Sequence, residues 1–161
     1  MIERIPDLLT GTELCLVAEV PGAGNRWGQL HLNKDIARQF FNLEPGADRS
    51  IMTEWVSADG HVLERKTRGL VFSQSNRNPR IEFRGPRVEY PPLPDRPLVA
   101  VVEAEYLTYR YRMLMPGEDG YDSVLRVLAA GPSIGRGLRR RIVTLDELEA
   151  YWPQSRLRGG V

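Results

Sequence analysis

The chain has 161 residues, of which 42% are hydrophobic and 27% are charged, and this composition is that of a soluble globular protein. Its length suits one domain with its own core. The longest apolar runs, such as residues 98–102, are too short to cross a membrane, and residues 1–9 hold acids where a signal peptide needs basic and apolar residues. The single cysteine, Cys15, excludes an internal disulfide and a thiolate metal cluster. We therefore expect one cytoplasmic domain over residues 1–161.

The charges are segregated along the chain, although the formal net charge is only +1. Seven basic residues and two acids lie between positions 61 and 88, and residues 136–141 hold four arginines and no acid. Of the 22 basic residues, 20 are arginine, whose guanidinium group binds phosphate or guanine bidentately. A GC-rich genome would also favour arginine over lysine. The segregation itself fits an electrostatic footprint on one side of the molecule.

The N-terminal part predicts two strands followed by a helix. Residues 12–20 and 27–32 read as strands, separated by the turn-forming residues 21–25. Asn33 is a suitable N-cap for a helix from Lys34 to about Asn42. The apolar face of this helix is formed by Ile36, Ala37, Phe40 and Phe41.

The middle of the chain predicts two hairpins. Residues 51–56 and 61–66 flank an Asp-Gly turn at positions 57–60. A second strand pair, residues 69–72 and 80–83, encloses a polar tract. The proline-rich residues 90–97 form a connector that cannot lie inside a strand.

The C-terminal part predicts more strands and a second short helix. Residues 98–115 read as extended, and their tail, residues 106–113, is expected to pair with residues 121–128. Residues 131–141 are expected to be a basic loop. The capping box from Thr144 to Glu147 predicts a helix from Leu145 to Trp152, followed by a frayed tail over residues 156–161. About eight strands and two short helices favour a mostly-β barrel or closed sandwich over an open sheet.

A search for catalytic and metal-binding residues yields little. His31 and His61 lack the spacing of metal ligands, and Cys15 reads as a buried structural thiol. The glycine-rich residues 131–137 lack the ending of a phosphate-binding loop. We expect no cofactor, no metal site and no catalytic residue.

One tripeptide gives an alternative. Glu64-Arg65-Lys66 is the Glu-X-Lys half of the motif of Mg²⁺-dependent nucleases. On a strand, Glu64 and Lys66 would share one face, where a carboxylate can hold a metal ion and an ammonium can orient water. Such sites need a second acid, and neither Asp48 nor Asp59 is well placed. A small nuclease centred on Glu64 and Lys66 stays as an alternative function.

Two polar segments carry the types of side chain that read DNA. The first arm, residues 24–29, offers an arginine, two amides and an indole before the second predicted strand. The second arm, residues 73–80, offers hydroxyls, amides and arginines within the most basic part of the chain. Arginine reads guanine, Asn and Gln read adenine, and hydroxyls bind phosphate. Either segment alone would read as a solvated turn, but two in one domain favour a grip on nucleic acid.

The order of these segments over residues 24–85 resembles the plant B-three DNA-binding domain and its bacterial relatives in restriction enzymes. That family has a strand ending in Ile-Pro-Lys, a helix ending in His/Phe-Phe-Pro and an Asp-Xaa-Xaa-Gly hairpin, followed by an Arg-rich strand, a Ser/Asn/Gln-rich loop and a strand that closes on glycine. The bacterial relatives carry an Asn-Trp-Gly-Gln, which Asn25-Arg26-Trp27-Gly28-Gln29 resembles. The other matching stretches are residues 32–34, 38–41, 58–60 and 73–78 and Gly85, with Asn33 in place of the family's proline.

The resemblance implies an open pseudobarrel of seven to eight strands with two short α-helices, which grips the major groove with both arms. It also implies the residues that contact DNA. On the first arm these are Asn25, Arg26, Trp27 and Gln29, and on the second they are Ser73, Gln74, Asn76, Arg77, Asn78 and Arg80. Four further residues complete the predicted DNA-binding set: His31, Lys34, Arg65 and Arg68.

We therefore expect a sequence-specific module for double-stranded DNA, serving as the target-recognition or effector-binding domain of a bacterial restriction-modification system. Cleavage would belong to a separate nuclease domain or subunit, and no membrane is involved. The remaining alternative is a protein-interaction module that binds no nucleic acid. Residues 156–160, RLRGG, coincide with the tail of ubiquitin, although here they follow a predicted helix instead of a strand.

Overall fold

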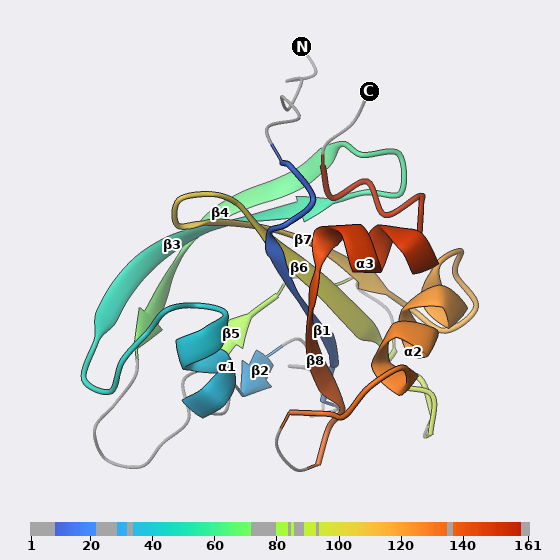
Figure 1. The fold of residues 1–161 in the computed structure, drawn as a ribbon, viewed down its shortest axis with the longest axis horizontal. Helices are drawn as coiled ribbons and strands as arrows, with labels where there is room; N and C mark the ends of the chain where they lie inside the picture. Colours follow the sequence, from blue (N-terminus) through green and yellow to red (C-terminus); the bar gives the residue numbers. More distant parts are fainter. Residues whose placement is uncertain are drawn as a thin grey trace.

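A computed structural model of the chain describes residues 9–21, 29–31, 34–71, 80–83, 85, 89–92, 94–134 and 137–158, with the backbone alone at residues 29–31, 71, 80 and 82. Six strands form one open sheet in the order β4-β3-β7-β6-β1-β8 (Figure 1). They are β1 (Leu14–Glu19), β3 (Asp48–Val56), β4 (Val62–Val71), β6 (Leu98–Glu105), β7 (Thr108–Leu114) and β8 (Arg140–Thr144). Neighbouring strands are antiparallel except β3 and β7, which are parallel.

Two further strands, β2 (Gln29–His31) and β5 (Arg80–Glu82), form a separate antiparallel ladder. The helices are α1 (Lys34–Gln39), α2 (Tyr121–Ala129) and α3 (Leu145–Tyr151). The mostly-β class is confirmed. The expected barrel is wrong, because the main sheet has six strands instead of seven to eight and its described residues leave β4 and β8 as open edges. The described residues also form three helices instead of two.

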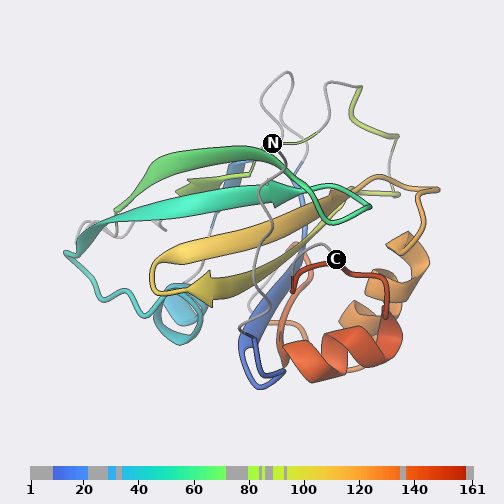
Figure 2. The same cartoon turned by 90° about the horizontal axis from the view of Figure 1, so that it is seen from above.

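Both faces of the sheet carry a hydrophobic core, because the side chains of β1 alternate between two buried layers. Leu16 and Ala18 join the layer that contains the apolar face of α1, whereas Cys15 and Val17 join the layer that contains α2 and α3. Figure 1 shows α1, β2 and β5 together on one side of β1, with α2 and α3 on the other. Seen from above, β3 and β4 extend away from α2 and α3 (Figure 2). The buried thiol of Cys15 confirms its structural prediction.

The hairpin expected from residues 106–113 and 121–128 is wrong. Strand β7 instead pairs with β6 through the tight turn at Tyr106 and Leu107, where Leu107 has a φ of 60°. Residues 121–129 form α2, in which Tyr121, Val124 and Leu128 are buried on one face. This 3.6-residue periodicity and the burial outweigh the strand preference of its valines.

Three other boundaries differ from the sequence predictions. Residues 69–71 continue β4, so β5 pairs with β2 and not with a strand at residues 69–72. The basic tract ends in strand β8, which pairs with β1 instead of staying a loop. The hairpin of β3 and β4 around residues 57–60 is confirmed, and so is the helix starting at Lys34, although α1 ends at Gln39. The described helices include none with the length and apolar character needed to cross a membrane.

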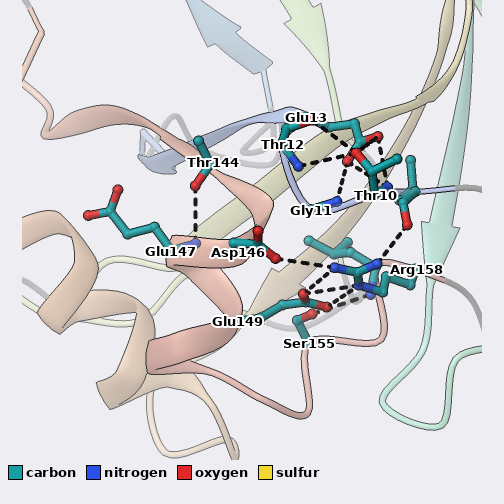
Figure 3. Close-up of polar contacts among 12 residues, drawn as sticks. Thr10, Gly11, Thr12, Glu13, Thr144, Asp146, Glu147, Glu149, Ser155 and Arg158 are labelled. Carbon is teal, nitrogen blue, oxygen red and sulfur yellow. Dashed lines mark hydrogen bonds and ion pairs between the residues drawn. The ribbon is translucent and has the colours of Figure 1, made fainter.

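The C-terminal segment is not frayed over residues 156–158. Leu157 is fully buried, and Arg158 donates to the backbone oxygen of Leu9 at 2.6 Å and to Glu149 at 2.8 Å. Figure 3 shows Arg158 between α3 and the N-terminal segment. The predicted N-cap of this helix is confirmed, since the Thr144 side chain accepts from the Glu147 backbone N–H at 3.1 Å. The tail therefore forms part of the core.

Truncation of the buried Leu157 side chain should destabilise the fold. We expect Leu157→Ala to lower the free energy of unfolding by about 2–4 kcal/mol, because it removes buried methyl groups and leaves a cavity. Chemical denaturation followed by circular dichroism measures the loss. The matched control is Leu63→Ala, whose side chain is 56% exposed and whose loss should stay within about 0.5 kcal/mol. Equal losses in the two variants would contradict a packed tail.

The buried thiol predicts a pH dependence. Burial raises the pKa of Cys15 far above its ordinary value, so the folded protein keeps a proton that the unfolded chain releases above about pH 8.5. The unfolded state then binds fewer protons, and stability falls as the pH rises. Denaturation curves between about pH 7.5 and 9.5 should show this fall in the wild type and a flatter profile in Cys15→Ala. Parallel pH profiles of stability in the wild type and Cys15→Ala would contradict a contribution from the buried thiol.

Candidate nucleic-acid interface

The ladder of β2 and β5 brings the ends of the two predicted arms together. Gln29 closes the first arm and opens β2, whereas Arg80 closes the second arm and opens β5. The register pairs Gln29 with Glu82 and His31 with Arg80. The arms therefore enter the ladder from opposite ends. Gln29 and Arg80 are offset by two positions, which is about 7 Å along the strands.

Apolar side chains fix this ladder to the main sheet. Ile81 of β5 and the following Phe83 are 2% and 1% exposed, and both belong to the core layer of α1. The ring of Phe83 lies 4.8 Å from the ring of Tyr111 on β7. Burying two such side chains stabilises their position by several kcal/mol, of the order of 1.5–3 kcal/mol each. The ends of the arms thus rest on a rigid base.

The structure places the predicted DNA-binding residues unevenly. Eight lie outside the described residues: Asn25, Arg26, Trp27, Ser73, Gln74, Asn76, Arg77 and Asn78. Three are described by their backbone alone, and they are the ladder residues Gln29, His31 and Arg80. The side chains of Lys34, Arg65 and Arg68 are described, and these three test how the basic residues are distributed.

Two of these three lie on the side of the ladder. Lys34 is exposed at the start of α1, three positions after His31 ends β2. Arg68 pairs across β4 with Ile51, a member of the core layer that also holds Ile81, so it projects to the ladder side of the sheet. Lys66, two residues earlier on the strand, is exposed and shares that face. Strand alternation therefore adds Lys66 to the basic residues on the ladder side, although the sequence suggests a role for it only in a nuclease site.

Arg65 faces the other way, into an ion cluster. Its Nε and Nη2 atoms donate to Glu54 Oε2 at 2.8 and 2.6 Å. The Glu54 side chain is 5% exposed and also lies 3.4 Å from Nε of the buried Arg110, which donates to the backbone oxygen of Leu157 at 2.7 Å. Glu54 therefore joins β4, β3, β7 and the C-terminal tail. Arg65 serves this cluster, on the face of the sheet opposite to the ladder.

The three described arginines of the basic tract, at positions 139–141, all have partners within the fold, although Arg139 stays 45% exposed. Arg141 donates to the backbone oxygen of Val127 at 2.8 Å and to Glu147 at 3.0 Å. Arg140 is 8% exposed, and its backbone N–H donates to the Ser133 hydroxyl at 2.9 Å. Arg139 binds Glu19. A count of arginines along the sequence thus overstates the charge available to a ligand.

The nuclease alternative finds no assembled site in the described part of the chain. Glu64 and Lys66 do share one face of β4, opposite Trp55 and Thr53. Asp48 begins β3 seven positions from Trp55, which is about 23 Å along the strand. Asp59 lies in the turn and holds His61 Nδ1 at 3.0 Å. The described residues contain no group of three or more His, Cys, Asp and Glu side chains that could hold a metal ion.

Comparisons with known proteins add a similarity to a solved structure. No family model and no curated protein matches the sequence. Among solved structures, the N-terminal domain of Helicobacter pylori LlaJI.R1 is similar to this chain, with a TM-score of 0.49 and 8% sequence identity. The similarity covers 80% of this chain and 97% of that domain. A TM-score of this size carries no argument about function, and B-three-like recognition stays a prediction.

The ion cluster predicts that loss of Glu54 destabilises the fold more than loss of Arg65. We expect Glu54→Gln to cost about 3–5 kcal/mol of folding free energy, because the buried Arg110 loses its carboxylate partner. Arg65→Gln should cost less than about 1 kcal/mol, since Arg65 is 41% exposed and Glu54 keeps Arg110. Urea denaturation of both variants checks the difference. Equal costs would mean that Arg110 does not depend on Glu54.

Proposed function

We propose that this chain is a sequence-specific module for double-stranded DNA, which grips the major groove with its two arms. The observation that carries the proposal is the pairing of β2 with β5, which joins the ends of two polar segments that are 51 positions apart at Gln29 and Arg80. Their offset of about 7 Å along the strands is smaller than the width of the major groove, about 12 Å. Two arms on one rigid ladder can therefore enter the same groove.

Charge and residue type support the same conclusion. Lys34, Lys66 and Arg68 lie on the ladder side of the sheet, whereas Arg65 is turned to the opposite face. Basic residues beside the arms would bind phosphates and set the register of the duplex. The arms themselves carry arginine, amide and hydroxyl groups, which read base edges. The resemblance to the B-three family extends this proposal to the target-recognition or effector-binding part of a restriction-modification system.

Selection from random duplex DNA tests the function directly. The purified chain is expected to enrich a defined motif and to bind it more weakly as the salt concentration rises, because phosphate contacts release counterions. Enrichment of no motif, together with no salt-dependent binding of any duplex, would overturn the proposal and favour a protein-interaction module. Plasmid nicking in the presence of Mg²⁺ would instead point to the nuclease.

Single arginine variants test the arms. We expect Arg26→Ala and Arg77→Ala each to weaken binding of the selected duplex by about 1–3 kcal/mol, because a guanidinium that reads a base loses its partner. The preferred base should also relax at the position read by that arginine. Arg126→Ala is the matched control, since Arg126 is exposed on α2, which packs on the opposite core layer. Arm variants that bind as tightly as this control would contradict the two-arm grip.

A further inference from the structure

The root of the first arm, where β1 ends, is held from two sides. Val20 donates its backbone N–H to the oxygen of Pro97 at 2.9 Å, and its own oxygen accepts from the Tyr90 hydroxyl at 2.7 Å. On the other side, the antiparallel pairing of β1 and β8 places Arg140 opposite Ala18. The first arm begins four positions after Val20. Its root is therefore fixed before the chain enters the arm.

Arg139 lies beside this root with its guanidinium oriented by a carboxylate. The Glu19 side chain accepts the Arg139 backbone N–H at 2.7 Å and lies 3.2 Å from its Nε, and Nη2 donates to the second carboxylate oxygen at 3.3 Å. The Glu19 side chain is 10% exposed, whereas that of Arg139 is 45% exposed. The Nη1 edge has no partner among the described residues. A guanidinium that is oriented by a carboxylate through Nε and Nη2, and whose Nη1 keeps its hydrogen-bond donors, is preorganised to bind a phosphate.

Arg96 borders the same root from the side of β6. Its Nη1 donates to the Tyr90 hydroxyl at 3.3 Å, and this is the only side-chain partner that the described residues give it. The Arg96 backbone oxygen accepts from the Tyr121 hydroxyl at 2.6 Å. Burial raises the pKa of Tyr121, and Asp95 and Glu19 raise it further while Arg139 lowers it. Arg96 and Arg139 therefore border the end of β1 from two sides, since Val20 binds the backbone of Pro97 and Glu19 binds the backbone of Arg139.

We propose that Arg96 and Arg139 form a phosphate clamp at the root of the first arm, which binds the sugar–phosphate backbone of the duplex. This inference rests on the proposed DNA-binding function and extends its footprint beyond the ladder side to the end of β1, where Arg139 binds Glu19 on the face of the sheet that α2 covers. The carboxylates nearby have separate roles: Glu19 orients Arg139, and Asp95 is exposed to solvent. The clamp contributes affinity and no sequence preference, because phosphates are the same in every sequence.

Salt titration of binding separates the clamp from the arms. The probes are the selected duplex and a scrambled duplex, measured with Arg96→Gln, Arg139→Gln, the double variant and the control Arg126→Gln. Each clamp variant should weaken binding of both duplexes about 3- to 10-fold, and the slope of log K against log salt should become shallower by about 0.9 for each lost phosphate contact. The selected motif should stay unchanged.

The outcomes distinguish the clamp from the function on which it rests. If the wild type binds the duplex and the double variant matches Arg126→Gln in affinity and slope, the clamp is overturned and the DNA-binding function stands. If the wild type binds no duplex, both the clamp and the DNA-binding function are overturned. Melting curves report whether Arg139→Gln folds, because this change leaves Glu19 without its guanidinium partner. Should it unfold, Arg96→Gln decides the question, since the one hydrogen bond of the Arg96 side chain among the described residues goes to a tyrosine hydroxyl.

Discussion

Burial of β1 on both faces is the constraint on which the rest of the fold depends. A strand with alternating apolar side chains on both sides needs a cover on each face. The α2 and α3 helices cover one face, and α1 with the β2–β5 ladder covers the other. The ladder therefore contributes, with α1, to the core layer on one face of the sheet. The proposed recognition surface is built from an element that the core itself holds in place.

The basic residues divide into two groups according to their partners. Arg110 and Arg65 bind the nearly buried Glu54, Arg158 ties α3 to the N-terminal segment, and Arg141 binds Glu147. These guanidinium groups join elements that are distant in sequence, and carboxylates within the fold neutralise their charge. Lys34 and Lys66 keep their exposure on the ladder side. The location of the carboxylates thus decides which basic residues can face a polyanion, and net charge does not.

Local chemistry predicted the elements whose determinants lie close together in the sequence. The capping box of α3 and the Asp-Gly turn of the β3–β4 hairpin needed only a few neighbouring residues. The turn at Leu107 escaped prediction, because a leucine with positive φ carries none of the glycine or asparagine that marks such turns. Strands β2 and β5 lie 51 positions apart, and only packing on the shared core pairs them. The same holds for β1 with β8.

The candidate site follows the same division. Residue types in the two arms could be read from the sequence, but the face of Arg65 depended on Glu54, eleven positions earlier on a neighbouring strand. Lys66 and Arg68 gained their place from the register of β4 against β3. Alternation within a strand shows that Arg65 and Arg68 point to opposite faces, yet it cannot show which face carries the ladder. That information lies in the long-range core contacts of Ile81 and Phe83.

The buried side chains of the ladder also fix the spacing of the arms. Each strand of the ladder is three residues long, so its backbone hydrogen bonds alone would hold the register weakly. A slip of one residue would turn Ile81 out of the core and bring a polar neighbour in. The cost of expelling that side chain, about 1.5–3 kcal/mol, therefore opposes any change in the offset between Gln29 and Arg80. The spacing of Gln29 and Arg80, on which the proposed two-arm grip depends, is in this way set by buried apolar residues.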